Sequence, residues 1–389
     1  MVNADGPARG PSHDETHRQA AGTTLSTSPL HQRHLDLGAK LAPFGGWSMP
    51  VEYAGGGVLK EHAAVRDAVG VFDVSHLGKA TVRGPGAVAY LNTCLSNDLE
   101  RIGPGRAQYT LCVDDASGGV VDDLIAYLRG PDEVFLVPNA ANAAEVCRRL
   151  TAAAPAGIDV RDEHRDLAVL AVQGPASDEL LGAVGLPAGH DYMSFVQAEH
   201  AGAPVTVCRT GYTGERGYEL VTPGAAGPAL WDALMAGGPD VAARACGLGA
   251  RDTLRTEMGY PLHGQDLSRE ISPVEARLVW AVGWAKDSFW GKEVLTAQRE
   301  AKSGPLLRGL VASGRGIARP GMSVSLPGAQ PAVGHVTSGT FSPTRRAGIA
   351  LALLDRSVHD GDEVSVQVRG RQEAFVVTRP PFVETGVRA

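Results

Sequence analysis

Two periodicities alternate along the chain, and together they predict a mixed α+β protein. Apolar residues at helical spacing indicate helices, and short runs of β-branched and aromatic residues between turn residues indicate strands. Because short turns join most of the predicted strands, we expect largely antiparallel sheets. The predicted helices cover residues 58–69, 85–99, 140–154, 176–185, 227–238 and 249–259, and the strands cover 71–76, 79–84, 106–114, 120–130, 132–139, 167–175, 204–211 and 217–223.

Changes in composition divide the chain into three parts. Residues 1–28 are polar and rich in Pro, Ser, Thr and Gly, which predicts a disordered tail. Residues 29–300 are predicted to form an α+β body of two intertwined domains. Residues 305–389 show strands and turns without a helical pattern, which predicts a separate C-terminal β-barrel domain. The body is expected to begin with a short helix in residues 30–44 that turns four leucines towards a core: Leu30, Leu35, Leu37 and Leu41.

The segment GGVVDDLIAYL, residues 118–128, places two adjacent carboxylates in an apolar strand. Strand alternation turns Asp122 and Asp123 to opposite faces, so only one of them can line a given cavity. A buried unpaired carboxylate is costly, and a strand end that faces a polar cavity avoids that cost. The alternative is that both carboxylates accept backbone hydrogen bonds at a turn.

Two further segments combine glycines or apolar residues with charged ones. In CRTGYTGERGYEL, residues 208–220, a glycine-rich hairpin precedes Glu219, whose carboxylate could accept two parallel N–H bonds from a planar ligand. An ordinary hairpin is the alternative. In residues 249–259, Arg251 and Arg255 share a helix face, and an inward arginine there needs Glu219 or an anionic ligand as its partner. A surface helix with solvated arginines is the alternative.

Charge and cysteine content narrow the classes of function. The net charge is -7 and there is no run of Lys or Arg, so we expect no nucleic-acid partner. No apolar stretch reaches the ~20 residues of a membrane helix and no signal core begins the chain, so we expect a cytoplasmic protein with no membrane contact. The five cysteines include no CxxC pair, which indicates reduced, buried thiols and no metal site.

The longest motifs follow one another in a characteristic order: FGGWSMPVEY, EHAAVRDAVGVFDVSHLGK, QYTLCVDDASGGVVDDLIAY, VPNAAN, VQGP, RTGYTGERGYEL, GLGARDTLRTEMGYPLHG and SGTFSPT. This series resembles the aminomethyltransferase family of the glycine cleavage system, the T proteins, from about Leu30 to Phe382. The resemblance implies a three-domain cloverleaf around a central tetrahydrofolate cavity, with a ferredoxin-like α+β body and a barrel-like C-terminal domain. It also implies two partners, lipoylated H protein and tetrahydrofolate. The implied reaction forms 5,10-methylenetetrahydrofolate, ammonia and dihydrolipoyl H protein, without a metal.

The resemblance also implies roles for individual residues. Asp123 takes the place of the family's catalytic aspartate, beside N5 and N10 of the folate, and it needs to be ionised there. Glu219 would hold the pteridine N–H groups, and Arg251 would contact the folate or Glu219. The other implied pocket residues are Tyr109, Asn139, Tyr212 and Leu77, of which Leu77 replaces a frequent methionine. Family members often have a substrate-contacting tyrosine near the C-terminus, where this chain has Val387 and Arg388.

Two other readings remain open at this point. Folate-dependent O- or S-demethylases would share the Glu219 contact but need no lipoyl partner. A non-catalytic folate-binding protein of iron–sulfur assembly would carry a K-G-C-Y-x-G-Q motif, whereas this chain reads RTGYTGE there. Because lipoyl carrier domains are acidic, we expect basic residues near the cavity to receive the H protein.

Overall fold

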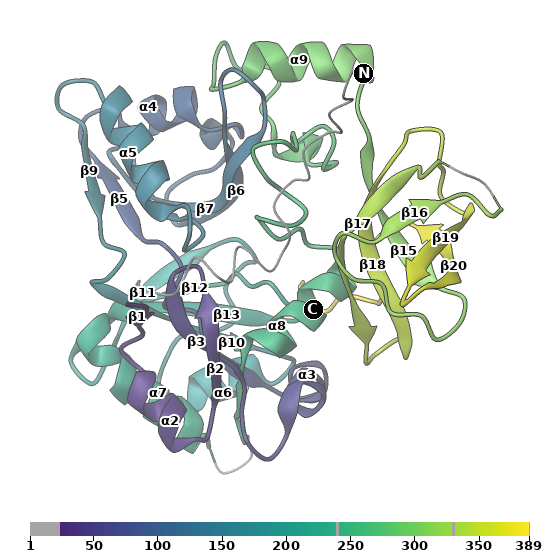
Figure 1. The fold of residues 1–389 in the computed structure, drawn as a ribbon. Coiled ribbons are helices and arrows are strands. Elements are labelled where there is room, and N and C mark those ends of the chain that lie inside the picture. The colour runs from purple at the N-terminus through teal and green to yellow at the C-terminus, as the bar shows by residue number, and fades with distance from the viewer. Residues whose placement is uncertain (1–23, 239–240, 329–330, 389) are drawn as a thin grey trace.

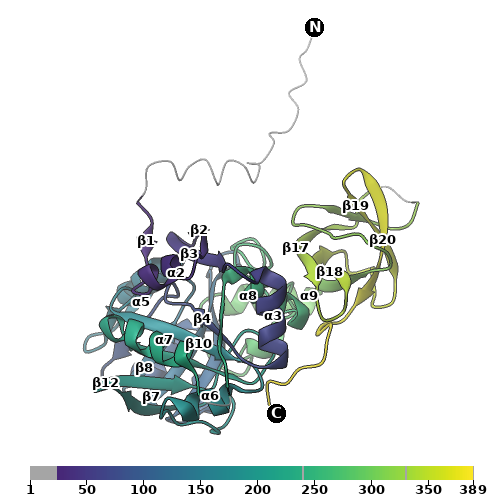
Figure 2. The same cartoon turned by 90° about the horizontal axis from the view of Figure 1, so that it is seen from below.

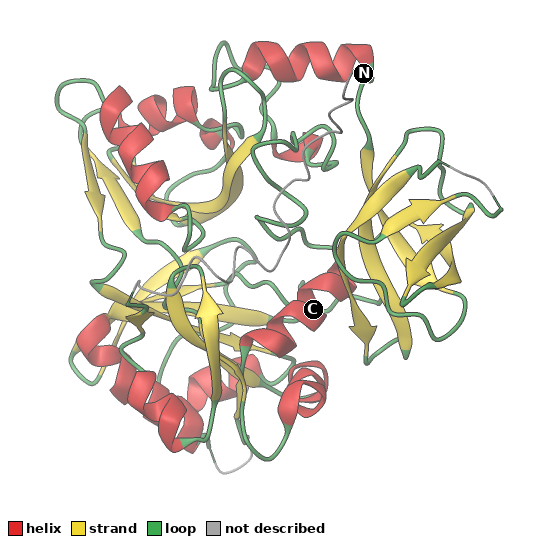
Figure 3. Cartoon of the chain, viewed as in Figure 1, coloured by secondary structure: helices red, strands yellow, loops and turns green. Residues whose placement is uncertain are grey.

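The computed structural model describes residues 24–238, 241–328 and 331–388, and the chain forms three lobes (Figure 1). Two lobes contain both helices and strands, whereas the third is built from strands and loops (Figure 3). Its six strands close into a barrel. The predicted α+β class and the predicted C-terminal barrel are therefore confirmed. The predicted disordered tail lies, up to residue 23, outside the described residues.

Each of the two mixed lobes repeats one succession of elements: strand, helix, three strands, helix and strand. Without the first strand of the triplet, this is the βαββαβ succession of a ferredoxin-like unit. The first unit has sheet order β6-β7-β8-β5-β9. Its elements are β5 (Ala80–Arg83), α4 (Ala87–Cys94), β6 (Arg106–Val113), β7 (Val120–Gly130), β8 (Glu133–Val137), α5 (Ala143–Ala153) and β9 (Asp159–Asp162).

The second unit has the same order with one strand inserted, β11-β12-β13-β10-β4-β14. The inserted strand, β4 (Gly70–Asp73), comes from the N-terminal part of the chain, so the two units are intertwined in sequence. The other elements are β10 (Leu167–Gln173), α6 (Ser177–Ala183), β11 (Phe195–His200), β12 (Ala203–Cys208), β13 (Gly217–Pro223), α7 (Gly227–Ala236) and β14 (Arg244–Cys246).

Both sheets are buried on two faces, which explains the nearly continuous apolar runs of their central strands. In β10, Leu170 and Val172 pack under helices α6 and α7, whereas Val169 and Ala171 face the opposite way. The apolar cluster that contains Val169 and Ala171 also contains Phe135 of the first sheet, so one core is shared between the two sheets. In β7 the same alternation sends Leu124, Ala126 and Leu128 under α4 and α5, and Ile125 and Tyr127 into the shared core.

The N-terminal region differs from its prediction. Strand β1 (Ser26–Thr27) pairs with β3 (Trp47–Glu52), so the folded chain begins before Pro29. The predicted helix ends early: α2 (His31–Asp36) is followed by a turn at Gly38, with φ +65°, and then by β2 (Lys40–Phe44). Consequently Leu30 is buried, but Leu35 and Leu37 are 47% and 40% exposed.

Helix α8 packs between the body and the barrel (Figure 2). It spans Leu248–Met258, between Gly247 and a left-handed Gly259 with φ +68°, and packs on α3 (Gly57–Asp67), β3 and β17. A further apolar core links α9 (Lys292–Ala301) and β6 with the barrel. The barrel strands are β15 (Leu306–Ala312), β16 (Ser323–Ser325), β17 (Gly334–Ser342), β18 (Ala347–Leu354), β19 (Glu363–Val368) and β20 (Arg371–Thr378). Outside the barrel, short 3-10 turns are formed by Leu99–Arg101, Gly224–Ala226 and Val279–Ala281.

Candidate functional site

The two aspartates of β7 are joined by one amide at the edge of the strand. Asp122 lies on the strand face that also carries Leu124, and Asp123 on the face of Tyr127, as the alternation predicts. Asn139, two residues beyond β8, donates from Nδ2 to Oδ1 of Asp122 at 2.9 Å and to Oδ1 of Asp123 at 2.8 Å. The asparagine thus continues the edge of the sheet where β8 has ended and fixes both carboxylates.

Asp122 acts as a buried anchor. Its Oδ2 accepts the backbone N–H of Asn139 at 2.9 Å, and its Oδ1 also accepts Nδ2 of Asn142 at 2.7 Å. Burial and the neighbouring Asp123 charge raise the pKa of Asp122 well above its usual range, while the donated N–H bonds act in the opposite direction. The backbone N–H of Asn139 thus binds Asp122 at the turn after β8, whereas the backbone contribution to Asp123 comes from its own N–H. The turn interpretation therefore applies to one of the two carboxylates.

Asp123 is only half-buried and has two partners from the protein. Its Oδ2 accepts the hydroxyl of Tyr109 at 3.0 Å, and its Oδ1 accepts Asn139. The sequence predicted a readily ionised group, but burial raises the pKa of Asp123, and the two donors only partly offset this effect. Each oxygen keeps a second lone pair, so the carboxyl group can bind or exchange a proton with a ligand.

Asn142 and His263 extend this network, and sequence reasoning did not single them out. Nδ2 of Asn142 lies 3.0 Å from Nδ1 of His263, and Nε2 of His263 lies 3.0 Å from the Val120 carbonyl oxygen. A carbonyl only accepts, so the assigned tautomer carries its proton on Nε2, and Nδ1 accepts from the amide. Both residues lie within the motifs VPNAAN and GYPLHG. Their 121-residue separation in the sequence gave no reason to pair them.

An exposed aromatic residue next to Asp123 was also missed. Trp280 stacks on Tyr109 with ring centroids 5.3 Å apart and an interplanar angle of 26°, and its side chain is 61% exposed. An exposed tryptophan is unusual, because an indole normally buries most of its surface. The stacked rings of Tyr109 and Trp280 therefore form a continuous aromatic surface that reaches the outside of the molecule.

Glu219 lies in β13, where the glycine-rich hairpin returns to the sheet. Its Oε2 accepts the hydroxyl of Thr210 at 2.6 Å, and that hydroxyl also lies 3.1 Å from the hydroxyl of Tyr127. In the described part of the chain, Oε1 of Glu219 has no hydrogen-bond donor. The half-buried carboxylate is thus fixed through one oxygen and free to accept through the other.

Arg251 lies in the first turn of α8, and it forms no direct ion pair with any other residue that the structure describes. Its guanidinium carbon is 4.8 Å from the ring centroid of Tyr212, and its buried Nη1 has no hydrogen-bond partner within the described residues. Burial lowers the pKa of Arg251, and the nearby charge of Glu219 acts to raise it. The direct hydrogen bond to Glu219 that the sequence suggested is not formed. A buried unpaired donor is instead available for an anionic or carbonyl group of a ligand.

The other inward arginine of α8 has a structural partner. Arg255 is almost fully buried and donates from Nη1 to Oδ2 of Asp266 at 2.8 Å, and Asp252 pairs with it at 2.7 Å. Sequence reasoning considered only Glu219 or a ligand as partners for this helix face. Asp266 was overlooked because the GYPLHGQDL segment folds back onto α8. Neither arginine is a solvated surface residue.

Tyr212 contacts Arg251 of α8 through its ring. Its hydroxyl donates to the Pro261 carbonyl oxygen, and its ring stacks on Tyr260 with centroids 5.7 Å apart. Burial raises the pKa of Tyr212, the charges of Arg255 and Arg251 oppose this effect, and the charge of Asp123 adds to it. Leu77 is half-buried against the core shared by the two sheets.

No group of three or more His, Cys, Asp or Glu side chains in the described ranges is arranged to hold a metal ion. None of the described helices is long and apolar enough to cross a membrane.

Comparison with known proteins identifies the family. The family model described as the GCVT N-terminal domain matches residues 30–286, and the glycine cleavage T-protein C-terminal barrel domain matches residues 306–384. The chain is 64% identical over 365 residues to an aminomethyltransferase of Parafrankia sp. (strain EAN1pec), covering 94% of this chain and 99% of that protein. It is 56% identical over 366 residues to that of Mycobacterium tuberculosis, covering 94% and 98%.

A solved structure agrees with these matches. The glycine cleavage system aminomethyltransferase T from Bartonella henselae has a TM-score of 0.87 at 32% sequence identity, over 93% of this chain and 99% of that one. At this level of identity and coverage, sequence and fold point to the same family. The chain therefore belongs to the T-protein family, the aminomethyltransferases of the glycine cleavage system.

Proposed function

We propose that the chain binds tetrahydrofolate between Glu219 and Asp123 and transfers to it the methylene of an aminomethyl group carried by lipoylated H protein. One observation supports this most strongly. Asp123 and Glu219 each keep free acceptor capacity, and Arg251, which lies over the Tyr212 ring, keeps a buried donor without a partner among the described residues. Buried polar groups without partners are uncommon in folded proteins, so this arrangement fits a polar ligand.

The residues present fit a reduced pterin. A pteridine offers an amide N–H and an exocyclic amine side by side, and Glu219, held by Thr210 through one oxygen, can accept from such a pair. Nη1 of Arg251 can donate to a ligand oxygen. Tyr212 and Leu77 supply flat and apolar surface, and orientation by these groups would bring the folate amines to Asp123.

Asp123 is the proposed catalytic residue. Tetrahydrofolate supplies two amine nitrogens, N5 and N10, that accept the methylene carbon. The carbon–sulfur bond to the lipoyl arm and the carbon–nitrogen bond to the departing ammonia break, while two carbon–nitrogen bonds form. The two protons lost by N5 and N10 balance those gained by the sulfur and the ammonia.

Asp123 can carry out the local part of this proton exchange. Its carboxylate accepts a proton from an attacking amine and can return it to a leaving group, while Tyr109 and Asn139 hold its orientation. A raised pKa suits this role, because a carboxyl group that titrates closer to neutrality both accepts and donates protons efficiently. Asp122 contributes by fixing Asn139.

The test is a complete reaction with both products measured. Purified protein, tetrahydrofolate and H protein loaded with the aminomethyl group should give 5,10-methylenetetrahydrofolate and ammonia in equal amounts. Methylated oxygen and sulfur compounds, offered in place of the loaded H protein, should give no methylated folate. Turnover of a methyl donor, or folate binding without either product, would refute the proposal.

A further inference from the structure

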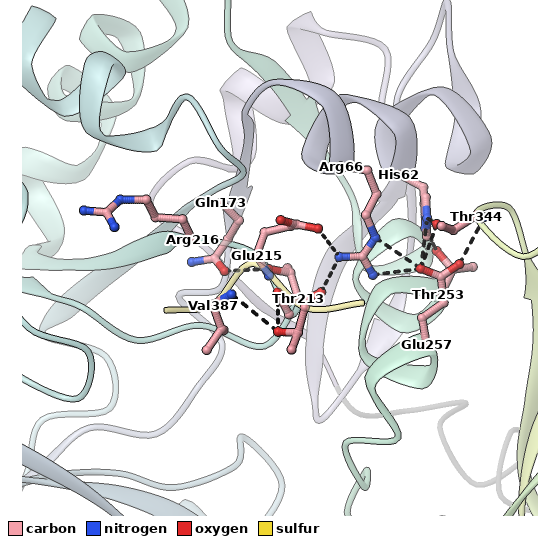
Figure 4. Close-up of polar contacts among 12 residues, drawn as sticks. His62, Arg66, Gln173, Thr213, Glu215, Arg216, Thr253, Glu257, Thr344 and Val387 are labelled. Carbon is pink, nitrogen blue, oxygen red and sulfur yellow. Dashed lines mark hydrogen bonds and ion pairs between the residues drawn. The ribbon is translucent and has the colours of Figure 1, made fainter. Parts of the chain in front are cut away.

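Arg66 connects three separate segments of the chain. It lies on α3, and its Nη1 donates to the Thr213 carbonyl oxygen and to Oε1 of Glu215, both at 2.8 Å. Its Nη2 donates to Oε2 of Glu257 on α8, also at 2.8 Å. Figure 4 shows the guanidinium between these groups, with Thr344 of the barrel contributing to the Glu257 side of the network at 3.0 Å.

The Thr213 and Glu215 contacts fall in the glycine loop, which we define as residues 209–217. This loop joins β12 to β13 and carries Tyr212, and it precedes Glu219. The pairing of β12 with β13 ends at Cys208 and Glu219. Within the described residues, the conformation of residues 210–215 thus depends mainly on side-chain contacts rather than on strand pairing.

Gln173 and the C-terminal segment are among the other groups that contact the glycine loop. Gln173 lies beneath it, donating from Nε2 to the Thr210 carbonyl oxygen at 3.2 Å and accepting the Thr213 hydroxyl at 2.8 Å. On its outer side, the backbone N–H of Gly386 and the hydroxyl of Thr385 donate to the Gly214 carbonyl oxygen, at 2.9 and 2.8 Å. The C-terminal segment therefore lies on the loop.

Glu215 couples Arg66 to this C-terminal segment. Only 14% of its side chain is exposed, and a Cβ atom built on Gly386 would lie 2.7 Å from its Oε2. In the described part of the chain, Arg66 is the one cation within ion-pair distance of Glu215. Without the charge on Glu215, this contact becomes an ordinary hydrogen bond of about half the strength, so the loop is held less firmly.

We propose that Arg66, through Glu215 and the Thr213 carbonyl, is a positioning residue that holds the glycine loop, and with it Tyr212 and Glu219, in the conformation that binds tetrahydrofolate. This inference rests on the proposed function of the site. Arg66 itself contacts neither predicted folate group. It acts on residue 213, next to Tyr212, and on the hairpin that leads into Glu219.

The expected effect is on folate affinity rather than on the chemical step. If the glycine loop occupies its binding conformation only part of the time, the apparent Kd rises by the inverse of that fraction. Once folate is bound, the loop is held in place, and Asp123 is fixed independently by Asn139 and Tyr109. The KM for tetrahydrofolate should therefore rise while kcat at saturation stays nearly constant.

The test compares the wild type with Glu215→Gln, Arg66→Lys and Glu133→Gln. Glu133 is the matched control, because it pairs with Arg83 and Arg129 in the first unit, away from the loop. Titration calorimetry with tetrahydrofolate gives Kd, and the complete reaction gives KM and kcat. Glu215→Gln should raise Kd and KM about tenfold or more with kcat within about twofold, Arg66→Lys should be intermediate, and Glu133→Gln should match the wild type.

Two results would overturn the inference separately. Equal Kd and KM in the wild type, Glu215→Gln and Arg66→Lys would refute the positioning role while leaving the proposed function intact. A wild type that neither binds tetrahydrofolate nor forms methylenetetrahydrofolate would instead refute the proposed function, and the inference with it. If Glu215→Gln does not fold, Arg66→Lys carries the comparison, because it keeps the positive charge beside both carboxylates.

Discussion

Glu257→Gln removes the charge at the centre of the Arg66 network, and its effect should depend on pH in a defined way. Glu257 is fully buried and accepts bonds from Arg66 on α3 and from Ser342 and Thr344 of the barrel. Burial acts to raise the pKa of Glu257, but the hydrogen bond and charge of His62, together with the bonds donated by Ser342 and Arg66, lower it to about 2, from an ordinary 4.5. The folded-state pKa thus lies below the unfolded one.

The sign and size of the effect follow from this difference. A depressed folded-state pKa gives stability that is fully present above about pH 4.5 and is lost as the pH falls towards 2. At 1.36 kcal/mol per pKa unit, the full contribution is about 3 kcal/mol, and about 2 kcal/mol of it disappears between pH 5 and pH 3. At pH 7, Glu257→Gln should therefore be less stable than the wild type by about 3 kcal/mol or more.

Urea unfolding of both proteins, followed by circular dichroism and tryptophan fluorescence at pH 7, 5 and 3, measures this difference. Taking the difference between the two proteins removes the contribution of all other acidic groups. The gap in the free energy of unfolding should shrink by about 2 kcal/mol from pH 5 to pH 3, because protonated Glu and Gln then resemble each other. A gap that stays constant over this range would refute the reasoning.

Three further predictions concern the site. Tyr109→Phe removes a bond to ionised Asp123, so the acidic limb of the pH profile of kcat/KM should move to higher pH, and an unchanged limb would argue against Asp123 as the titrating group. Arg251→Met should weaken tetrahydrofolate binding about tenfold or more in calorimetry without lowering stability, because it removes a buried donor that lacks a partner. Gly214→Ala should lower the free energy of unfolding, measured in urea, by about 1–3 kcal/mol. Gly214 has φ +81°, and a Cβ atom there would lie 2.0 Å from Sδ of Met258, so an unchanged free energy of unfolding would contradict this packing.

The periodicity of the sequence predicted the elements well and their arrangement less well. Alternation in β7 correctly separated Asp122 from Asp123, and the glycines around α8 fixed its ends to within a residue or two. The similar rhythm of the two halves of the body corresponds to two ferredoxin-like units. Insertion of β4 into the second sheet was not predictable, because parallel pairing of β4 with β14 is a long-range contact with no local signal.

The N-terminal error has a local physical cause. Leu35 and Leu37 fit a helical apolar stripe, but the left-handed turn at Gly38 ends the helix and lets β2 pair with β3. Ser28, counted with the polar tail, is buried because its hydroxyl donates to Asp73, which also contacts His34 at 2.8 Å. Ser28 and Asp73 are 45 positions apart in the sequence, so local composition gives no sign of their contact and predicts that Ser28 is exposed to solvent.

In the candidate site, too, the sequence predicted some residues and missed others. Tyr109, Asn139 and Asp123 could be grouped from the family's motifs, and the structure brings them into hydrogen-bond contact. Partners contributed by distant segments could not be found in this way, and Asp266 and His263 are examples. Family membership also replaces the two alternatives left open by the sequence, a demethylase and a non-catalytic folate-binding protein.

The most direct test of the account is a single-turnover reaction of Asp123→Asn beside the wild type. Enzyme in excess is mixed with tetrahydrofolate and aminomethyl-loaded H protein, and methylenetetrahydrofolate and ammonia are followed together, with folate Kd measured on the same preparations. Asparagine keeps the size of the side chain but cannot accept a proton, so we expect both products to form about 10²–10⁴-fold more slowly while folate still binds. Product formation within about threefold of the wild type would contradict a catalytic role for Asp123.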